Sequence, residues 1–372
     1  MSISRTTAMS CKTFVWSAFG LTTLLIAAYL SLCCAIDPFN LYHPISSLRY
    51  ISTEQRLARP AVARSPNYDS YFVGSSMIQE FVPADFNKAL GARFAHLTLS
   101  AASSYEDLNL LKLLAPRRYK YLVMEVYFQS FTPNLHATYY PDYPAYLYDD
   151  NPYNDIEAYL TCNPFMLGEL YRAYFRNFRG IDKDPHGYRP TPDGYYSWES
   201  QKRWDAQSVR AEIASIWQYR HGKTQFSTEN FRAILETAAP RFEHVLLYFP
   251  PVHADALRMD FIAGPPENMT NYLAWKKDAI AMASAYPQVV FIDYQTINPY
   301  TLRDENYFDF NHYRANLRQM ILDDFASWLK RHRLAHGDFG QLADRAYGQR
   351  LSPQSLFFPE GSRRADAAEV SN

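Results

Sequence analysis

Runs with the pattern of β-strands alternate with runs that have the pattern of helices along most of this 372-residue chain. The run from Tyr119 to Tyr127 is almost continuously apolar, as in a strand that is buried on both faces. Repeated strand–helix units predict a mostly parallel sheet with helices on both faces, hence an α/β fold. The expected strands are 68–73, 94–99, 119–127, 244–249 and 288–292, and the expected helices are 83–90, 105–114, 228–237, 271–285 and one from just after residue 312 to about 330.

The alternation is interrupted between residue 131 and about residue 225 by a segment dense in Tyr, Pro, Asn and Asp. We interpret this segment as an insertion, with a helix around 163–177, in a domain that spans residues 67–335. Its aromatic rings suit stacking on sugar rings, and the alternative is that they pack the insertion's own small core. Residues 37–66 are expected to form an extended lead-in, and the polar residues 336–372 a flexible tail.

The N-terminal segment Phe14–Ile36 is uncharged and mostly apolar. As a helix it is about 34 Å long, which is enough to cross a bilayer. Arg5 and Lys12 precede it and the next basic residue is Arg49, so the positive-inside rule puts residues 1–13 in the cytoplasm. We favour an uncleaved single-pass anchor in the inner or plasma membrane, with a periplasmic main domain. A cleaved signal peptide and a buried core helix are the alternatives.

Composition narrows the function classes. The net charge is −1, which gives no electrostatic reason to expect nucleic acid as a partner. Of the cysteines, only Cys162 belongs to the expected exported part, so no disulfide can form within that part. No pair of Cys or His residues has the spacing of zinc ligands, and we expect neither a metal nor another cofactor.

Two short motifs carry the residue types of nucleophilic acyl chemistry. Gly74-Ser75-Ser76 follows a predicted strand, and Asp309-Phe310-Asn311-His312 follows the last predicted strand. Ligands of open α/β sheets sit beyond the carboxyl ends of the strands, where both motifs are expected. An Asp placed three residues before a His can orient the imidazole and stabilise its protonated form. The alternatives are an N-cap serine for Ser76 and a helix-capping Asp309 with His312 in the first helical turn.

These residues predict a serine mechanism in which His312 takes the proton of Ser76 as the hydroxyl attacks an ester carbonyl. Asp309 would fix the imidazole, and an acyl-enzyme would be resolved by water or by an acceptor hydroxyl. The Ser76 N–H and an N–H of the turn Ser100-Ala101-Ala102-Ser103 would stabilise the oxyanion. An α/β-hydrolase is disfavoured because no Gly-x-Ser-x-Gly elbow surrounds Ser76.

The chain resembles the SGNH/GDSL hydrolase superfamily, in its membrane-anchored, exported branch, which includes the alginate O-acetylation proteins and the D-alanyl transfer protein of teichoic acid modification. The resemblance rests on Gly74-Ser75-Ser76, the turn 99–105 and Asp309-x-x-His312. It implies a flavodoxin-like three-layer α/β/α fold with Ser76, His312 and Asp309 as the triad. The lead-in Asp37-Pro38-Phe39-Asn40 is also similar to the segment that follows the anchor in such proteins.

The sequence departs from the family at the oxyanion positions. The family's oxyanion glycine is replaced by Ala101 or Ala102, and its third-block Asn has no counterpart, although Tyr127 or Gln129 stands near that position. His253 and Arg189 are lesser candidates for substrate contact. A backbone N–H survives the change from Gly to Ala, but the tight turn becomes harder to form.

Together these features predict an anchored esterase or O-acyltransferase that acts on an acyl group, such as acetyl, of a cell-envelope or exported polysaccharide. By analogy with the family, a multi-span membrane acyltransferase is a possible partner. The alternative function is a catalytically weak subunit of the same fold that binds glycan or a membrane partner.

Overall fold

The computed structural model describes residues 11–43, 50, 52–179, 191–195, 197, 205–219, 224–262 and 264–357. At its centre lies a six-stranded sheet with the order β2-β1-β3-β4-β5-β6, in which only the last pair is antiparallel. The first five strands follow the flavodoxin-like order, which confirms the predicted mostly parallel α/β fold. The strands are β1 (Ser70–Gly74), β2 (Phe94–Thr98), β3 (Tyr119–Glu125), β4 (Phe242–Phe249), β5 (Val289–Asp293) and β6 (Gln341–Leu342).

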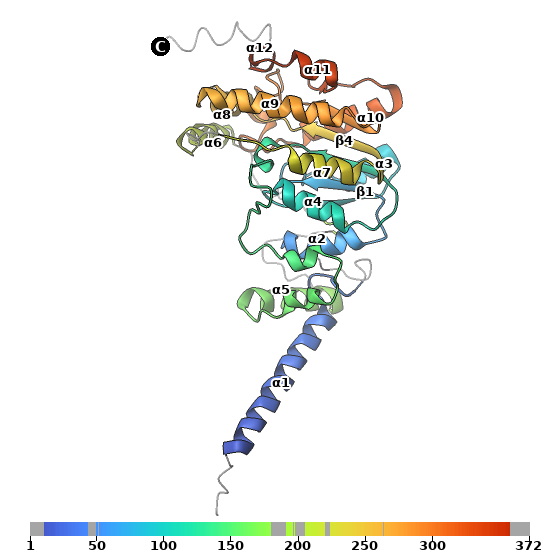
Figure 1. The fold of residues 1–372 in the computed structure, drawn as a ribbon, viewed down its shortest axis with the longest axis vertical. Coiled ribbons are helices and arrows are strands. Elements are labelled where there is room, and N and C mark those ends of the chain that lie inside the picture. Colours follow the sequence, from blue (N-terminus) through green and yellow to red (C-terminus); the bar gives the residue numbers. More distant parts are fainter. Residues whose placement is uncertain are drawn as a thin grey trace, which may run out of the picture.

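Helices cover both faces of the sheet (Figure 1). One layer packs as neighbours in the order α2 (Gln55–Arg64), α4 (Ser104–Leu113), α7 (Glu229–Ala238) and α9 (Pro266–Ala283). On the other face α3 (Pro83–Leu90) contacts α10 (Ala315–Arg331). The remaining helices are α1 (Cys11–Ile36), α5 (Pro164–Phe178), α6 (Ala206–Tyr219), α8 (Ala254–Phe261), α11 (Arg345–Arg350) and α12 (Pro353–Phe357), with short 3-10 turns η2 (Phe128–Ser130), η3 (Ala145–Tyr148), η4 (Asn154–Tyr159) and η6 (Asp304–Asn306).

Local sequence explains why the predicted elements form where they do. Helix α3 begins with Pro83 in its first turn and ends at Gly91, whose φ of 65° is the left-handed conformation that ends helices. Helix α4 begins with a capping box, in which the Ser103 side chain and the Glu106 side chain each bond the other's backbone N–H. These signals were readable in the sequence, and both helices lie within a residue of their expected limits.

The expected extended lead-in is wrong for residues 55–64, which form helix α2 with Pro60 inside it. A proline in a helix interior leaves the carbonyl four residues earlier without its usual donor. Here that carbonyl belongs to Arg56, and the Tyr148 hydroxyl of the insertion donates to it at 2.9 Å. The insertion thus supplies the hydrogen bond that Pro60 removes, which no local sequence pattern reveals.

The expected flexible tail is also wrong up to residue 357. Strand β6, α11 and α12 pack against the domain, and Phe339, Leu356 and Phe357 are buried. The Tyr347 hydroxyl donates to Asp293 Oδ2 at 2.6 Å, at the end of β5. Residues 358–372 lie outside the described part of the chain.

Helix α1 projects away from the body of the molecule (Figure 1). It is the one helix within the described residues that is long and apolar enough to cross a membrane, a test that a signal sequence also passes. Its last turn enters the domain, where Cys33 and Ile36 are buried. Asp37 follows with no exposed surface and accepts the backbone N–H groups of residues 41–43 at 2.7–2.9 Å. The Tyr159 hydroxyl also donates to Asp37 Oδ1, at 2.5 Å.

We predict that Asp37→Ala lowers the free energy of unfolding by about 3 kcal/mol, because the buried Tyr159 hydroxyl and three backbone N–H groups lose a charged acceptor. Thermal unfolding of the full chain in detergent micelles measures the change. The matched control is Asp150→Ala, which alters an exposed aspartate of the insertion. Equal stability of the two variants would show that the Asp37 hydrogen bonds do not hold the junction together.

Candidate functional site

The turn after β1 requires a glycine. Gly74 has a φ of 137°, a backbone conformation that residues with a side chain rarely adopt. A Cβ at this position would lie 2.5 Å from Cγ of Glu125, at the end of the neighbouring strand β3. The Ser75 N–H donates to Glu125 Oε1 at 2.5 Å, which fixes the turn on β3. Ser76 is then half-buried at the carboxyl edge of the sheet, in a turn rather than at the N-cap of a helix.

The Asp309–His312 motif forms a compact loop before α10. Asp309 Oδ1 accepts the backbone N–H groups of Asn311 and His312 at 3.0 and 2.7 Å. Its Oδ2 bonds His312 Nδ1 at 2.7 Å. A bridge between Tyr307 and Tyr313 closes the loop, so His312 lies outside the first turn of α10. The loop therefore presents the imidazole in one orientation.

The two motifs meet at the edge of the sheet. Ser76 Oγ lies 2.7 Å from His312 Nε2, and His312 Nδ1 faces the Asp309 carboxylate. A carboxylate at Nδ1 assigns the ring proton to that nitrogen, which leaves Nε2 to accept the Ser76 hydroxyl proton. Burial of Asp309 opposes its ionisation, but the hydrogen bonds and charge of His312 outweigh burial and lower the pKa of Asp309. The sequence motifs thus come together as a Ser–His–Asp chain.

Two backbone N–H groups, in the turns that follow β1 and β2, are available as donors. Among the described residues, neither the Ser76 N–H nor the Ala101 N–H donates to a protein acceptor. The two turns are tied together, because the Leu99 N–H donates to the Gly74 carbonyl at 3.0 Å. Ala101 is exposed and has a φ of 52°, the left-handed conformation in which a glycine is favoured.

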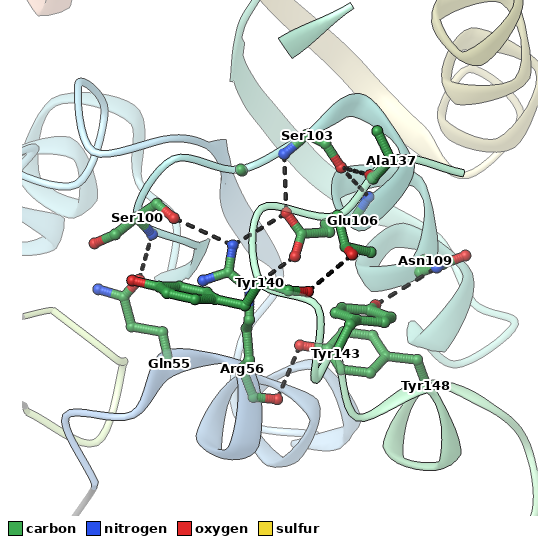
Figure 2. A network of polar contacts seen from close by, with 12 residues as sticks. Gln55, Arg56, Ser100, Ser103, Glu106, Asn109, Ala137, Tyr140, Tyr143 and Tyr148 are labelled. Carbon is green, nitrogen blue, oxygen red and sulfur yellow. Dashed lines mark hydrogen bonds and ion pairs between the residues drawn. The ribbon is translucent and has the colours of Figure 1, made fainter. Parts of the chain in front are cut away.

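A polar network from α2 holds the turn that contains Ala101 (Figure 2). Gln55 Oε1 accepts the Ser100 N–H at 2.5 Å, and the Arg56 guanidinium donates to the Ser100 carbonyl at 3.2 Å. Arg56 also makes a two-pronged ion pair with buried Glu106, at 2.7 and 3.1 Å. The same Glu106 accepts the Ser103 N–H at 3.0 Å, so both ends of the turn are fixed. Sequence reasoning missed Gln55 and Arg56 because it placed them in an extended segment.

Glu125 is a second residue that sequence reasoning missed. It ends a strand that is otherwise apolar in its second half, and an acidic residue in such a strand was the available signal. Its Oε2 is buried without a hydrogen-bond partner. Burial raises the pKa of Glu125 to about 7, against the opposing effects of the Ser75 hydrogen bonds and the nearby His312. A carboxyl group that titrates near neutrality therefore lies behind the serine turn.

The remaining predicted site residues are Tyr127, Gln129, Arg189 and His253. Tyr127 is buried and packs edge-on against Phe128 at 4.6 Å between ring centroids. Gln129 is exposed and lines a cavity of about 260 Å³ with Phe128 and residues of α8 and α9. Arg189 lies outside the described residues.

His253 is fully buried in the turn before α8. Its Nδ1 accepts the Asp255 N–H at 3.2 Å, so Nε2 carries the proton and donates to Asp304 at 3.0 Å. Burial lowers the pKa of His253, which keeps the ring neutral. Its backbone N–H donates to the Phe310 carbonyl at 3.0 Å, inside the Asp309–His312 loop. The structure therefore gives His253 a supporting position under that loop rather than an open surface.

Within the described residues, no group of three or more His, Cys, Asp and Glu side chains could hold a metal ion. No family model and no curated protein matches the chain. One of the solved structures that match is described as "a putative platelet activating factor from Streptococcus pneumonia". Its sequence is 10% identical to this chain. The alignment covers 73% of this chain and 89% of the other protein's chain, and the TM-score is 0.35. A similarity at this level does not bear on function.

We predict that Gly74→Ala lowers the free energy of unfolding by about 3 kcal/mol, because a Cβ there combines backbone strain with a clash against Glu125. Gly91→Ala is the matched control: Gly91 also has a positive φ, but a Cβ there meets no atom within 4 Å. Chemical denaturation of the full chain compares the two variants. A Gly74→Ala variant no less stable than Gly91→Ala would contradict the close packing of β1 on Glu125.

The raised pKa of Glu125 predicts a stability difference that depends on pH. Between about pH 4.5 and 7 the folded state holds this proton and the unfolded state releases it, so wild-type stability falls as pH rises through that window. Glu125→Gln removes the effect and should be more stable than wild type above pH 7, by about 3 kcal/mol, with little difference at pH 4.

Denaturation of both proteins at several pH values measures this difference. Asp107→Asn is the companion control. Asp107 is also buried, and burial together with the charge of Glu125 raises the pKa of Asp107. A constant difference between wild type and Glu125→Gln across the pH range would overturn the assignment.

Proposed function

We propose that this chain is a serine-dependent acyl enzyme of the SGNH type, which removes or transfers a small acyl group. The observation that carries the proposal is the unbroken chain of hydrogen bonds from Ser76 Oγ through His312 to Asp309, each 2.7 Å long. An ordinary N-cap serine and an ordinary surface Asp–His pair have no reason to meet in this order and at these lengths.

In the proposed reaction, His312 Nε2 takes the Ser76 proton as Oγ attacks the carbonyl carbon of an ester. The ionised Asp309 stabilises the imidazolium that forms. The bond between the carbonyl carbon and the alcohol oxygen then breaks, and the imidazolium returns the proton to the departing alcohol. Water or a second alcohol then gives its proton to His312 and attacks the carbonyl carbon of acyl-Ser76. The bond from that carbon to Ser76 Oγ breaks, the imidazolium returns the proton to Oγ, and the acid or the new ester leaves.

The developing negative charge on the carbonyl oxygen needs donors that are already in position. The N–H groups of Ser76 and Ala101 are suited to this role because neither donates to a described protein acceptor. Gln55 and Arg56 support it indirectly, since Gln55 holds the Ser100 N–H and Arg56 holds the Ser100 carbonyl, which shares a peptide unit with the Ala101 N–H. We assign these two residues as positioning residues for the oxyanion donor.

The substrate we propose is an acyl ester, such as an acetyl ester, of a cell-envelope or exported polysaccharide. The position at the cell envelope is supported by α1, whose last turn packs into the domain through the buried residues Cys33 and Ile36. A segment packed in this way favours a retained anchor over a removed signal peptide. An enzyme held at the membrane meets its substrate there, and a multi-span acyltransferase is the partner we propose for transfer.

The second candidate function is a catalytically weak subunit that binds glycan or a membrane partner. It is favoured by one observation: Ala101 adopts a left-handed conformation that costs about 1–2 kcal/mol for a residue with a side chain. A strained turn with few donors gives less stabilisation of an oxyanion than a turn built on glycine. The two candidates differ in whether Ser76 reacts as a nucleophile.

We predict that a fluorophosphonate probe labels the full chain at Ser76, because His312 activates that hydroxyl. Ser76→Ala should lose labelling and the hydrolysis of p-nitrophenyl acetate, with a loss in rate of about 10³-fold or more. The matched control is Ser75→Ala, which keeps the backbone N–H that bonds Glu125 and should retain both. Labelling that survives Ser76→Ala, or folded wild type that takes no label, would favour the binding subunit.

A further inference from the structure

A stripe of exposed apolar side chains runs along α5. Leu167, Tyr171, Tyr174 and Phe178 follow one another at spacings of four, three and four residues, which places them on one face of the helix. Their exposed fractions are 50%, 51%, 41% and 58%. Contiguous exposed apolar surface of this kind marks a site of contact with a protein or a membrane. We call these four residues the α5 stripe.

A neighbouring face of α5, about 100° around the helix from the stripe, is packed on the domain, so the orientation of the helix is fixed. Met166, Leu170 and Ala173 are buried there. Glu169 is buried among them, where it accepts the Tyr50 hydroxyl at 2.9 Å and pairs with Arg172. Because this face is occupied, a rotation of α5 cannot bury the stripe within the described domain.

The start of α5 lies beside α1. Asn163 caps α5 by accepting the Met166 N–H at 2.8 Å, and two residues earlier the Thr161 carbonyl accepts the Tyr29 hydroxyl at 3.0 Å. Tyr29 is on α1, about 10 Å before its domain end at the rise of an α-helix. Figure 1 shows α5 at the junction between α1 and the body, lying across the direction of α1.

The exposed surface of α1 is continuous with this region. Its side chains are largely exposed as far as Leu32, and Cys33 is the first buried residue. Residues 11–28 of α1, whose side chains are all exposed, span about 27 Å at the rise of an α-helix, against about 30 Å for the hydrocarbon core of a bilayer. The level of Tyr29 therefore falls close to the edge of the hydrocarbon, and so does the start of α5.

The charges on α5 fit an anionic surface. The basic residues Arg176 and Arg179 reach the surface near the end of α5, whereas Arg172 is paired with buried Glu169, the only acidic residue of the helix. Arginines beside exposed Tyr, Phe and Leu are the composition of helices that lie in the headgroup region of membranes. Tyrosine in particular is enriched at the boundary between lipid and water.

We propose that α5 is an interfacial helix, which lies on the outer surface of the same bilayer that α1 crosses. The α5 stripe enters the boundary between headgroups and acyl chains, and the long side chains of Arg176 and Arg179, on the polar side of the helix, reach toward lipid phosphates. This proposal rests on α1 as a membrane-crossing helix, and it does not depend on the reaction of Ser76. Two contacts with one surface, through α1 and α5, fix the tilt of the domain as well as its distance from the membrane.

The test uses the full chain in nanodiscs of phosphatidylcholine and phosphatidylglycerol, with an environment-sensitive fluorescent amino acid at single positions. Position 174 or 178 reports on the α5 stripe, and position 24 of α1 is the positive control. Ile262 and Leu302 are the negative controls, because they are exposed apolar residues on other parts of the domain. We expect lipids with a spin label near the headgroup to quench positions 174 and 178 and to leave 262 and 302 unquenched.

A double variant separates contact with lipid from mere proximity. Leu167→Glu with Tyr171→Glu should lose the quenching at position 178 while position 24 stays quenched by lipids labelled deep in the acyl chain. The matched pair Ile262→Glu with Leu302→Glu should change neither. Thermal unfolding and fluorophosphonate labelling of both pairs serve as checks on folding, since none of these residues belongs to the proposed catalytic machinery.

Each of the other outcomes overturns the proposal. If position 24 is quenched while 174 and 178 remain as accessible to water as 302, α5 does not touch the bilayer. If chemical cross-links join position 174 to a second chain in place of lipid quenching, another copy covers the stripe. If position 24 itself is unquenched, α1 does not cross the membrane. Fluorophosphonate labelling of Ser76 is measured separately in every case, so failure of the proposed reaction can be told apart from failure of the membrane contact by α5.

Discussion

The candidate site depends on how closely the end of β1 approaches the end of β3. Gly74 lies where any side chain would overlap Glu125, and the Ser75 N–H closes the contact at 2.5 Å. This contact fixes the turn from which Ser76 faces the Asp309–His312 loop. The hydrogen bond between Ser76 and His312 therefore follows from backbone packing in the sheet, not from attraction between the two side chains alone.

The same site is supported by segments that lie far from it in the sequence. Helix α2 fixes the Ser100 peptide through Gln55 and Arg56, and the insertion supplies the Tyr148 hydroxyl that compensates for Pro60 in that helix. A buried ion pair such as Arg56–Glu106 adds little net stability when both partners are present, but it restricts the positions that they can adopt. The ion pair acts here by fixing positions, because Arg56 and Glu106 both also form hydrogen bonds to the turn that contains Ala101.

The sequence was sufficient for the parts of the fold that local rules determine. Strands buried on both faces read as apolar runs, and α3 is bounded by Pro83 and Gly91, so their limits could be predicted. Ser76, His312 and Asp309 could be proposed because residues after parallel strands share one edge of a sheet. Helix α2 could not be predicted, because a proline at position 60 argues against a helix unless Tyr148 is known to lie beside Arg56. Glu125 was missed for a similar reason: its role depends on a contact with Gly74 that only three dimensions show.

The way α1 joins the domain has a consequence for how the protein meets its substrate. Asp37 and Tyr159 fix the chain immediately after α1, so within the described residues a buried hydrogen bond joins the end of the apolar helix to the folded body. With α1 in a membrane, Ser76 would be held at one height and could not swing outward to search the surrounding space. A long polymer would then have to be drawn past the fixed site segment by segment. The rigidity of this joint would select for substrates that emerge close to the lipid.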